Sequence, residues 1–195
     1  MSKVIALTGG IGSGKTFVAS IFQKLAGIPC FCSDLEAKKI MNENDYIKKE
    51  IISLLGPESF VNNKLNSQFI RNKIFNSQKK LKSINDLVHK QVRINFEKWL
   101  RVQNSKYVLK ETAILFEHNY HLDVGLSILV TAPIKTRIER IIKRDNVSRK
   151  KIEKIIENQW DDKKKMHLSD YFIENISKVK TIKKVQDLIE VFSVI

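Results

Sequence analysis

Short runs of apolar residues alternate along the chain with longer segments in which apolar residues recur every three or four positions. The short runs are rich in β-branched and aliphatic residues, which is typical of buried strands. They predict strands at 4–7, 28–32, 107–109, 126–130 and 171–173. Because helical segments separate these strands, the pattern favours an α/β fold, with a parallel five-stranded sheet and helices on both faces.

The clearest predicted helix covers Lys15–Ala26 and ends at Gly27, a residue that favours a left-handed helix end. Its apolar residues have the spacing of an amphipathic helix. They are Val18, Ile21, Phe22 and Leu25. Further helices are expected at 35–41 with Ser33 as N-cap, from Pro133 in the first turn to about 144, from Ser148 onward, and at 181–192.

A long helical stretch without a convincing strand occupies residues 45–104, with breaks near Gly56-Pro57 and Asn62-Asn63. It interrupts the alternation of strands and helices, so we expect an inserted helical subdomain beside the sheet. The strongly basic segment 143–168 is a candidate mobile flap. The core of this single domain would then comprise 1–44, 105–142 and 169–195.

The net positive charge of the chain indicates anionic partners but does not identify their chemical class. The 195 residues carry 35 Lys and Arg against 21 Asp and Glu, a net charge of +14, which attracts phosphorylated substrates or nucleic acid. Most of the excess is lysine spread along the chain, a pattern typical of a biased genome composition. No apolar run is long enough to cross a membrane. Cys30 and Cys32 are expected to be buried free thiols, and we expect a cytoplasmic protein.

The segment after the first strand carries the strongest motif. Residues 9–16 read Gly-Gly-Ile-Gly-Ser-Gly-Lys-Thr and match the phosphate-loop pattern G-x-x-x-x-G-K-[ST] in full. Glycines let backbone N–H groups approach phosphate oxygens, and the helix that begins at Lys15 adds its positive end. Lys15 would place its charge beside the β- and γ-phosphates, and the Thr16 hydroxyl would be a Mg²⁺ ligand. The strand before the loop and the helix after it are the context that this motif requires.

Other motifs indicate the class of phosphate-loop protein. The Asn-Lys-x-Asp motif of GTPases does not occur in the sequence. The acidic strand end that ATP-driven motors need is poorly matched by 107–111, because Lys110 interrupts that strand. A small-molecule kinase is therefore favoured, in which a substrate hydroxyl attacks the γ-phosphate. A basic ATPase that binds nucleic acid and a non-catalytic nucleotide-binding regulator are the alternatives from other classes.

A kinase of this kind needs a carboxylate near the acceptor hydroxyl and cations around the transferred group. Asp34 follows the second strand, at the sheet edge where ligands bind in such folds, although it could also only cap the next helix. Arg137, Arg140 and Arg144 share one helical face, where they could grip phosphate or form a solvated basic face. The opposite, buried side is expected to carry Ile138, Ile141 and Ile142.

Several segments are similar to one known family. They are Ala6–Thr16 with its Thr-Gly-Gly-Ile-Gly run, Ser33-Asp34 followed by Ala37-Lys38, Leu115-Phe116-Glu117, Arg140 with Arg144-Asp145, Gln159, and Ser169–Asn175. In this order and at this spacing, these motifs resemble those of the dephospho-CoA kinases. The resemblance runs from residue 6 to residue 175.

The resemblance implies a P-loop kinase fold with a helical substrate-binding insertion and a lid. It implies transfer of a phosphoryl group from ATP, held with Mg²⁺, to the ribose 3′-hydroxyl of dephospho-CoA, the last step of coenzyme A synthesis. The catalytic residues would be Lys15, Asp34 and Arg140, and Thr16 would bind the metal. The nucleotide-binding residues would be Gly10, Ile11, Gly12, Ser13, Gly14, Lys15, Thr16, Phe17, Arg144 and Asn175. The acceptor-binding residues would be Asp34, His89, Leu115, Phe116, Glu117 and Arg140.

The resemblance further implies a monomer or weak homo-oligomer with no nucleic-acid or membrane partner. Another P-loop kinase, acting on a nucleoside or nucleotide, is the nearest alternative. The chain departs from the family at His89-Lys90 (usually His-Pro), at Glu111–Ala113 (usually Asp-x-Pro), at Arg137 (usually Gln) and at Ile155 (usually Arg). Two other features are expected to be solvated surface: the pair His118 and His121, and the run Lys163–Lys165.

Overall fold

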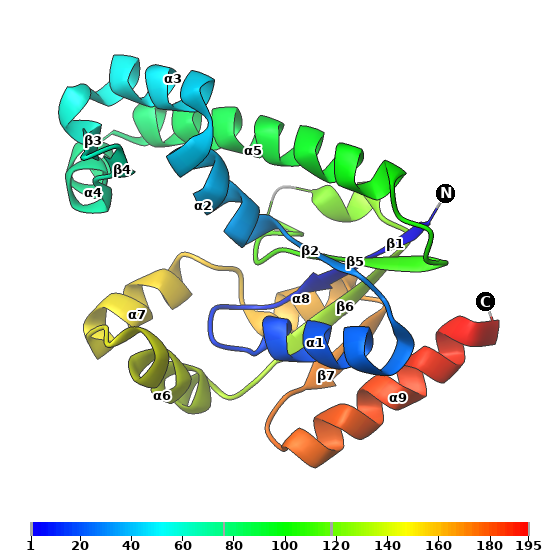
Figure 1. The fold of residues 1–195 in the computed structure, drawn as a ribbon. Helices are drawn as coiled ribbons and strands as arrows, with labels where there is room; N and C mark the ends of the chain where they lie inside the picture. Colours follow the sequence, from blue (N-terminus) through cyan, green and yellow to red (C-terminus); the bar gives the residue numbers. More distant parts are fainter. Residues whose placement is uncertain (1, 76, 118, 195) are drawn as a thin grey trace. The chain divides into compact units, whose positions relative to one another are not determined.

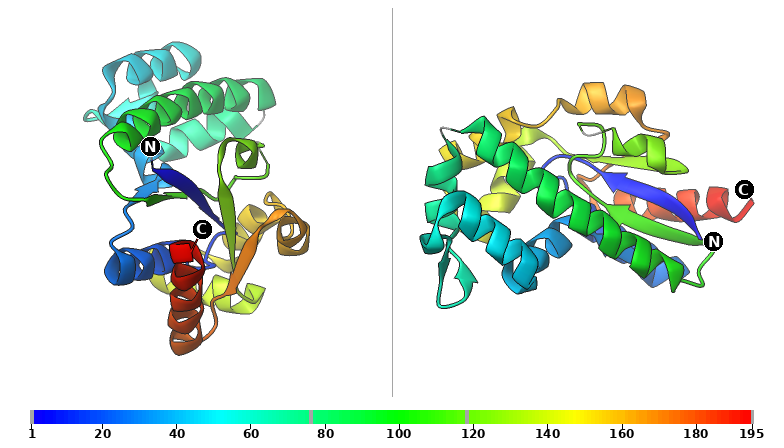
Figure 2. Two further views of the ribbon diagram at one scale, coloured as in Figure 1. Left: turned by 90° about the vertical axis from the view of Figure 1, so that its right-hand side faces the viewer. Right: turned by 90° about the horizontal axis from the view of Figure 1, so that it is seen from above.

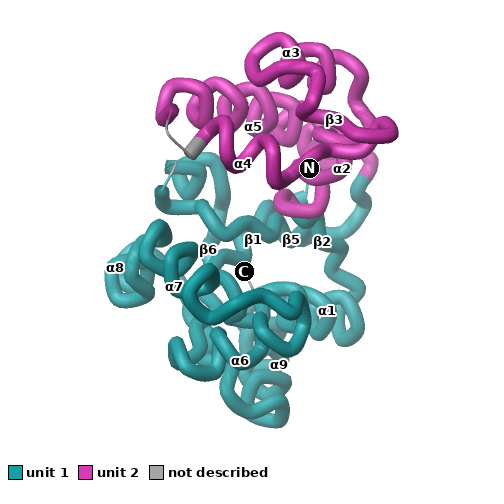
Figure 3. Tube along the Cα trace, turned by 90° about the vertical axis from the view of Figure 1, so that its left-hand side faces the viewer, with its two compact units in different colours: residues 1–32, 103–195 teal, residues 33–102 magenta. Residues whose placement is uncertain are grey.

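A computed structural model describes residues 2–75, 77–117 and 119–194 of the chain (Figure 1). These residues form two compact units, which Figure 3 shows in different colours. The first unit combines residues 1–32 with 103–195, and the second comprises Ser33–Val102. The second unit therefore begins earlier in the chain than the insertion expected at 45–104.

Five parallel strands form the sheet of the first unit, in the order β2-β5-β1-β6-β7. They are β1 (Lys3–Thr8), β2 (Cys30–Cys32), β5 (Tyr107–Glu111), β6 (Leu126–Thr131) and β7 (Tyr171–Glu174). The central strand β1 pairs Leu7 with Glu111 of β5 and Thr8 with Leu129 of β6. The predicted strands and their parallel arrangement are confirmed, although β2 is shorter than the expected 28–32.

The described residues of the first unit also form five α-helices. They are α1 (Lys15–Ala26), α6 (Ile134–Asp145), α7 (Arg149–Glu157), α8 (Asp162–Leu168) and α9 (Lys178–Val194). Figure 2 shows α1 and α9 on the same side of the sheet, where they pack against each other. Because side chains alternate along a strand, Ile5 and Leu7 of β1 face this layer, while Ala6 packs on the other side with Leu115 and Phe116.

The structure corrects several local expectations. Leu25 (46% exposed) and Ile142 (41% exposed) are not core residues, whereas Arg137 on α6 is only 4% exposed. Pro133 is the N-cap of α6 rather than part of its first turn. Ser33 is the first residue of a helix rather than its N-cap. Burial depends on tertiary packing, and a helix can begin one residue earlier or later than expected. Apolar spacing alone specifies neither.

The second unit is mainly helical. It contains α2 (Ser33–Glu43), α3 (Asp45–Leu55), the 3₁₀ helix η1 (Pro57–Ser59), β3 (Phe60–Val61), β4 (Lys64–Leu65), α4 (Ser67–Phe75) and α5 (Gln78–Arg101). The expectation of no strand here is wrong, because β3 and β4 form a small antiparallel hairpin. Asn62 and Asn63 connect β3 to β4. Both adopt left-handed backbone angles, as a tight two-residue hairpin turn requires. The predicted helix breaks near Gly56-Pro57 and Asn62-Asn63 are confirmed.

Aromatic packing anchors α9 to the rest of the first unit. Phe192 on α9 is 2% exposed, and its ring contacts the rings of Phe22, Tyr107 and Tyr171 at centroid distances of 5.7–6.3 Å. These partners come from α1, β5 and β7. A buried phenylalanine with three aromatic neighbours stabilises the fold through apolar burial and ring contacts.

We therefore expect Phe192→Ala to lower the free energy of unfolding by about 3–5 kcal/mol, the usual cost of a large cavity in a packed core. Urea unfolding followed by circular dichroism measures the change. Phe172→Ala is the matched control: Phe172 lies on β7 and is 50% exposed, so its loss should cost about 1 kcal/mol or less. Equal losses for the two variants would contradict this description of the core.

Candidate active site

The loop between β1 and α1 has the conformation of an anion-binding site. Gly14, the N-cap of α1, has a left-handed φ of 95°, and a Cβ there would run into the side-chain amide of Asn175. At Gly10 a Cβ would collide with the guanidinium of Arg137. The first N–H groups of α1 have no helical partners, so they are available to phosphate oxygens at the positive end of the helix dipole.

Side chains from distant parts of the first unit hold the carbonyl groups of this loop. The Ser13 carbonyl accepts hydrogen bonds from Asn175 Nδ2 (2.9 Å) and Arg140 Nη1 (3.3 Å). The Ile11 carbonyl accepts one from Arg137 Nε (2.8 Å). With these acceptors directed toward protein donors, the loop keeps the shape in which its amides can bind an anion.

Lys15 adds a positive charge to the start of α1. Its side chain is only 7% exposed, and Nζ donates a hydrogen bond to the Gly9 carbonyl (3.0 Å). A buried ammonium group gains strongly from an anionic partner, because low local dielectric strengthens the attraction. The position suits the role predicted for Lys15, charge compensation of a bound phosphate.

A carboxylate lies beside the Thr16 hydroxyl. Thr16 Oγ1 donates to Glu111 Oε1 at 3.0 Å, and Glu111, the last residue of β5, is 5% exposed. The expectation that Lys110 interrupts this strand is wrong, because β5 continues through Lys110 to Glu111. Neighbouring side chains point to opposite faces, and the Lys110 ammonium lies over the Tyr120 ring. A hydroxyl and a carboxylate oxygen in contact are the donors that Mg²⁺ prefers in phosphate-loop enzymes.

The Glu111 carboxylate also affects Cys30 on β2. Burial and, to a smaller extent, the charge of Glu111 raise the pKa of Cys30 to about 12. Cys30 and Cys32 are free cysteines, as expected, but both are half-buried rather than buried. The Cys30 thiol therefore stays protonated at neutral pH and is a poor nucleophile.

The candidate base Asp34 lies in the first turn of α2, in the second unit, and is exposed. It follows the carboxyl end of β2 by two residues, and the last residue of β2, Cys32, pairs with Glu111. Glu111 in turn contacts Thr16. The strand that leads to Asp34 therefore ends at the same edge of the sheet as the phosphate loop, where ligands of such folds bind.

The structure brings two other predicted residues together beneath the phosphate loop. Arg140 Nη2 donates to the Asn175 carbonyl (2.8 Å), and Asn175 is 4% exposed with its amide oxygen bonded to Thr181. Arg144 is not brought to the loop by any such contact: it is exposed and forms a two-bond ion pair with Asp145. Phe17 packs its ring against the core of the first unit.

The predicted acceptor-binding residues after β5 are mostly internal. Leu115 and Phe116 are fully buried and pack with Ala6, so they can shape a site rather than present side chains to it. Glu117 Oε1 forms an ion pair with Lys165 Nζ at 2.6 Å. Lys165 is completely buried, so the expectation that Lys163–Lys165 is a solvated run is wrong at this position.

Two of the three histidines that the sequence analysis singled out lie within the described residues. His89 is half-buried on α5 of the second unit, and His121 is half-buried on the 3₁₀ helix η2 (Tyr120–Asp123). The other member of the proposed surface pair, His118, lies outside the described residues.

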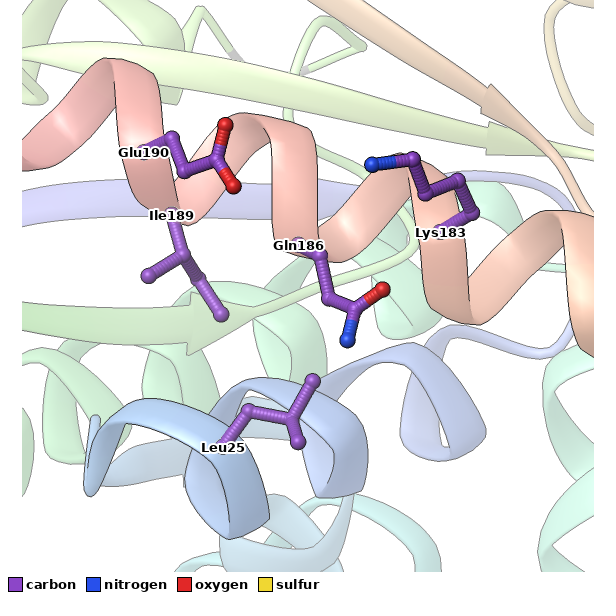
Figure 4. A pocket seen from close by; sticks show the side chains of 5 residues that line it. All are labelled: Leu25, Lys183, Gln186, Ile189 and Glu190. Atoms are coloured by element: carbon purple, nitrogen blue, oxygen red, sulfur yellow. The ribbon is translucent and has the colours of Figure 1, made fainter.

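A separate surface groove lies between α1 and α9. Figure 4 shows its lining residues: Leu25, Lys183, Gln186, Ile189 and Glu190. Leu25 lies near the end of α1, ten residues after Lys15, which corresponds to about 15 Å along the helix axis. This groove is therefore not part of the phosphate site.

Comparison with known proteins places the chain in a family. The family described as dephospho-CoA kinase matches residues 3–181. The chain belongs to the dephospho-CoA kinase family. A dephospho-CoA kinase from Bacteroides fragilis is 32% identical over 190 residues, which cover 97% of this chain and 92% of that protein. The kinase family and enzyme class expected from the sequence are confirmed.

Two solved structures share the fold of this dephospho-CoA kinase family member. A protein from Thermus thermophilus of known crystal structure superposes with a TM-score of 0.88 at 24% identity and covers 97% of both chains. The dephospho-CoA kinase from Campylobacter jejuni superposes with a TM-score of 0.72 at 22% identity and covers 99% of this chain and 98% of that one. The expected P-loop kinase fold is thereby confirmed.

Two residues of the site region were missed by the sequence analysis of this family member. Glu111 could have been found, because an acidic residue that ends a strand next to the phosphate-loop strand suits a metal site. Lys165 carries no such signal, since it is one of three consecutive lysines and only packing distinguishes it from its neighbours.

Proposed function

We propose that this protein transfers the γ-phosphoryl group of ATP to the ribose 3′-hydroxyl of dephospho-CoA, giving coenzyme A and ADP. The bond from the γ-phosphorus to the oxygen retained by ADP breaks, and a bond to the acceptor oxygen forms. The observation that carries the proposal is the Thr16–Glu111 contact beside the phosphate loop, in a chain that matches its family over residues 3–181.

The phosphate loop supplies the binding energy for the nucleotide in this proposal. The N–H groups at the start of α1 bind phosphate oxygens, and Lys15 neutralises charge on the β- and γ-phosphates. Arg140 supports the loop through the Ser13 carbonyl and can stabilise charge that develops on the transferred group. Arg144, on the exposed last turn of α6, and residues 143–158 of the basic segment would close over ATP and exclude water, which otherwise competes as acceptor.

Thr16 and Glu111 are the residues that would hold Mg²⁺. A hydroxyl and a carboxylate 3.0 Å apart match the oxygen ligands and the small number of protein contacts that this ion accepts in kinases. When bound there, Mg²⁺ neutralises part of the phosphate charge.

Asp34 is the proposed base. Its exposed carboxylate, two residues beyond the end of β2, would accept a hydrogen bond from the 3′-hydroxyl and orient it or take its proton as the new bond forms. His89, Leu115, Phe116 and Glu117 would contribute to the acceptor site, the last three chiefly by fixing the course of the chain after β5.

The wider context of the enzyme is also a proposal. No helix among the described residues is long and apolar enough to cross a membrane. We propose a cytoplasmic enzyme, monomeric or weakly self-associating, whose partner is the small-molecule acceptor rather than nucleic acid.

Release of ADP in the presence of different acceptors tests the proposed reaction. With ATP and Mg²⁺, dephospho-CoA should accelerate ADP release many-fold over a mixture without acceptor, and mass spectrometry should identify coenzyme A as the product. Adenosine and AMP test the alternative kinases, and DNA or RNA tests the nucleic-acid ATPase. Faster release with any of these than with dephospho-CoA would contradict the proposal.

Asp34→Asn should reduce kcat by about 10²–10⁴-fold, the usual contribution of a general base, with little change in the Kd for ATP. Steady-state kinetics and calorimetric ATP titration measure the two quantities. Asp45→Asn is the matched control, because Asp45 is also an exposed aspartate in the first turn of a helix in the second unit. An unchanged kcat in Asp34→Asn would remove Asp34 as the base.

Glu111→Gln should raise the Mg²⁺ concentration needed for half-maximal activity by roughly 10–100-fold, because a neutral amide binds the ion more weakly than a carboxylate. A Mg²⁺ titration at saturating ATP and acceptor measures this shift. Glu174→Gln serves as control, since Glu174 also ends a strand of the same sheet but is exposed. The role assigned to Glu111 would be contradicted by superimposable Mg²⁺ titrations of wild type and Glu111→Gln.

A further inference from the structure

The seven residues from Gln159 to Lys165, here called the clasp, contact two functional segments of the first unit. The clasp comprises the turn before α8 and the first half of that helix. Asp162 and Lys165 lie three residues apart on α8 and therefore share a face. Their charges interact: burial raises the pKa of Asp162, and the positive charges of Arg137 and Lys165 oppose that rise.

One side of the clasp holds the phosphate loop. The Ile11 N–H donates to Gln159 Oε1 (2.9 Å), and the Ile11 carbonyl accepts from Arg137 Nε (2.8 Å). The same guanidinium forms an ion pair with Asp162 (3.2 Å). Both polar backbone groups of Ile11 are thus fixed by the clasp, one directly and one through a buried arginine.

The other side of the clasp holds the segment 113–117 that follows β5. Lys165 Nζ forms an ion pair with Glu117 Oε1 (2.6 Å) and donates to the Ala113 carbonyl (3.2 Å). The backbone N–H of Trp160 also donates to Glu117 Oε1 (3.3 Å). The Trp160 side chain packs against the cluster that contains Leu115 and Phe116. This segment begins two residues after Glu111 and is the one assigned above to the acceptor site.

The ion pairs of the clasp are better suited to positioning the segments they contact than to stabilising the fold. Apolar residues of similar volume usually stabilise a fold as well as a buried ion pair does, because removing charges from water is costly. Charged hydrogen bonds, however, define direction and distance sharply. Two ion pairs on one short helix, each with one buried partner, therefore fix the phosphate loop and the segment 113–117 relative to each other.

We propose that the clasp couples the two substrate sites, so that nucleotide bound at the phosphate loop strengthens acceptor binding at the site that the segment 113–117 shapes. Asp162 and Lys165 act as positioning residues, the first through Arg137 and the second through Glu117. The inference rests on the proposed function for the identity of the acceptor. Because coupling between two binding sites is reciprocal, acceptor strengthens nucleotide binding by the same factor.

Calorimetric titration measures the coupling. The Kd of dephospho-CoA is determined without nucleotide and with saturating Mg²⁺ and a non-hydrolysable ATP analogue, and the ratio of the two is the coupling factor. For wild type we expect a factor of about 5–150, the usual range for coupled sites. In Lys165→Met and in Asp162→Asn the factor should fall close to 1. In Asp162→Asn, which alters a contact to Arg137 rather than to the segment 113–117, the Kd without nucleotide should change little.

Controls separate coupling from loss of structure. Lys163→Met alters an exposed lysine of the same helix and should keep the wild-type factor. Lys165→Met leaves Glu117 buried without its partner and can unfold, so Asp162→Asn, which keeps the side-chain shape at a 23% exposed position, supplies an independent test. Asp162→Glu should partly restore the factor, which a purely structural role would not predict.

The outcomes distinguish this inference from the proposed function. A folded Asp162→Asn protein with the wild-type coupling factor would overturn the inference. So would a wild-type factor of 1 in an enzyme that turns over dephospho-CoA, and in that case the function would stand. Absence of any dephospho-CoA binding by wild type would overturn the function and, with it, the inference.

Discussion

The site depends above all on the hydrogen bonds that hold the carbonyl groups of the phosphate loop. A glycine-rich segment has many accessible conformations, and only a few of them point several amides toward one anion. Asn175 and Arg140 bind the Ser13 carbonyl, and Arg137 binds that of Ile11. These donors lie more than 120 residues away in the chain. The loop is therefore shaped by tertiary structure.

Strand register provides the second constraint. Leu7 of β1 pairs with Glu111, and Cys32 of β2 pairs with the same residue from the other side. A shift of β5 by one residue would turn Glu111 to the opposite face and bring Lys110 toward Thr16. The register thus places a carboxylate rather than an ammonium beside the Thr16 hydroxyl, and it decides whether this edge of the sheet can hold a magnesium ion.

The phosphate loop, the strands and the helix α1 were predictable because their signals are local. Gly14 and Lys15 belong to a continuous motif, and alternating strands and helices specify the sheet. Arg137, Glu111 and Lys165 were misjudged because their environments come from distant contacts. A lysine in a run of three carries the same local signal as its neighbours, but only Lys165 meets Glu117. The hairpin around Asn62 and Asn63 was missed because two-residue strands are too short to show alternation.

In the proposed reaction, the γ-phosphoryl group of ATP is transferred to one hydroxyl of the acceptor and not to water. Phosphorus-31 NMR of the complete reaction mixture tests this selectivity. We expect one new phosphomonoester signal, coupled to the ribose H3′ proton, in an amount equal to the ADP formed. Inorganic phosphate in place of this signal, or a phosphomonoester on another hydroxyl, would contradict it.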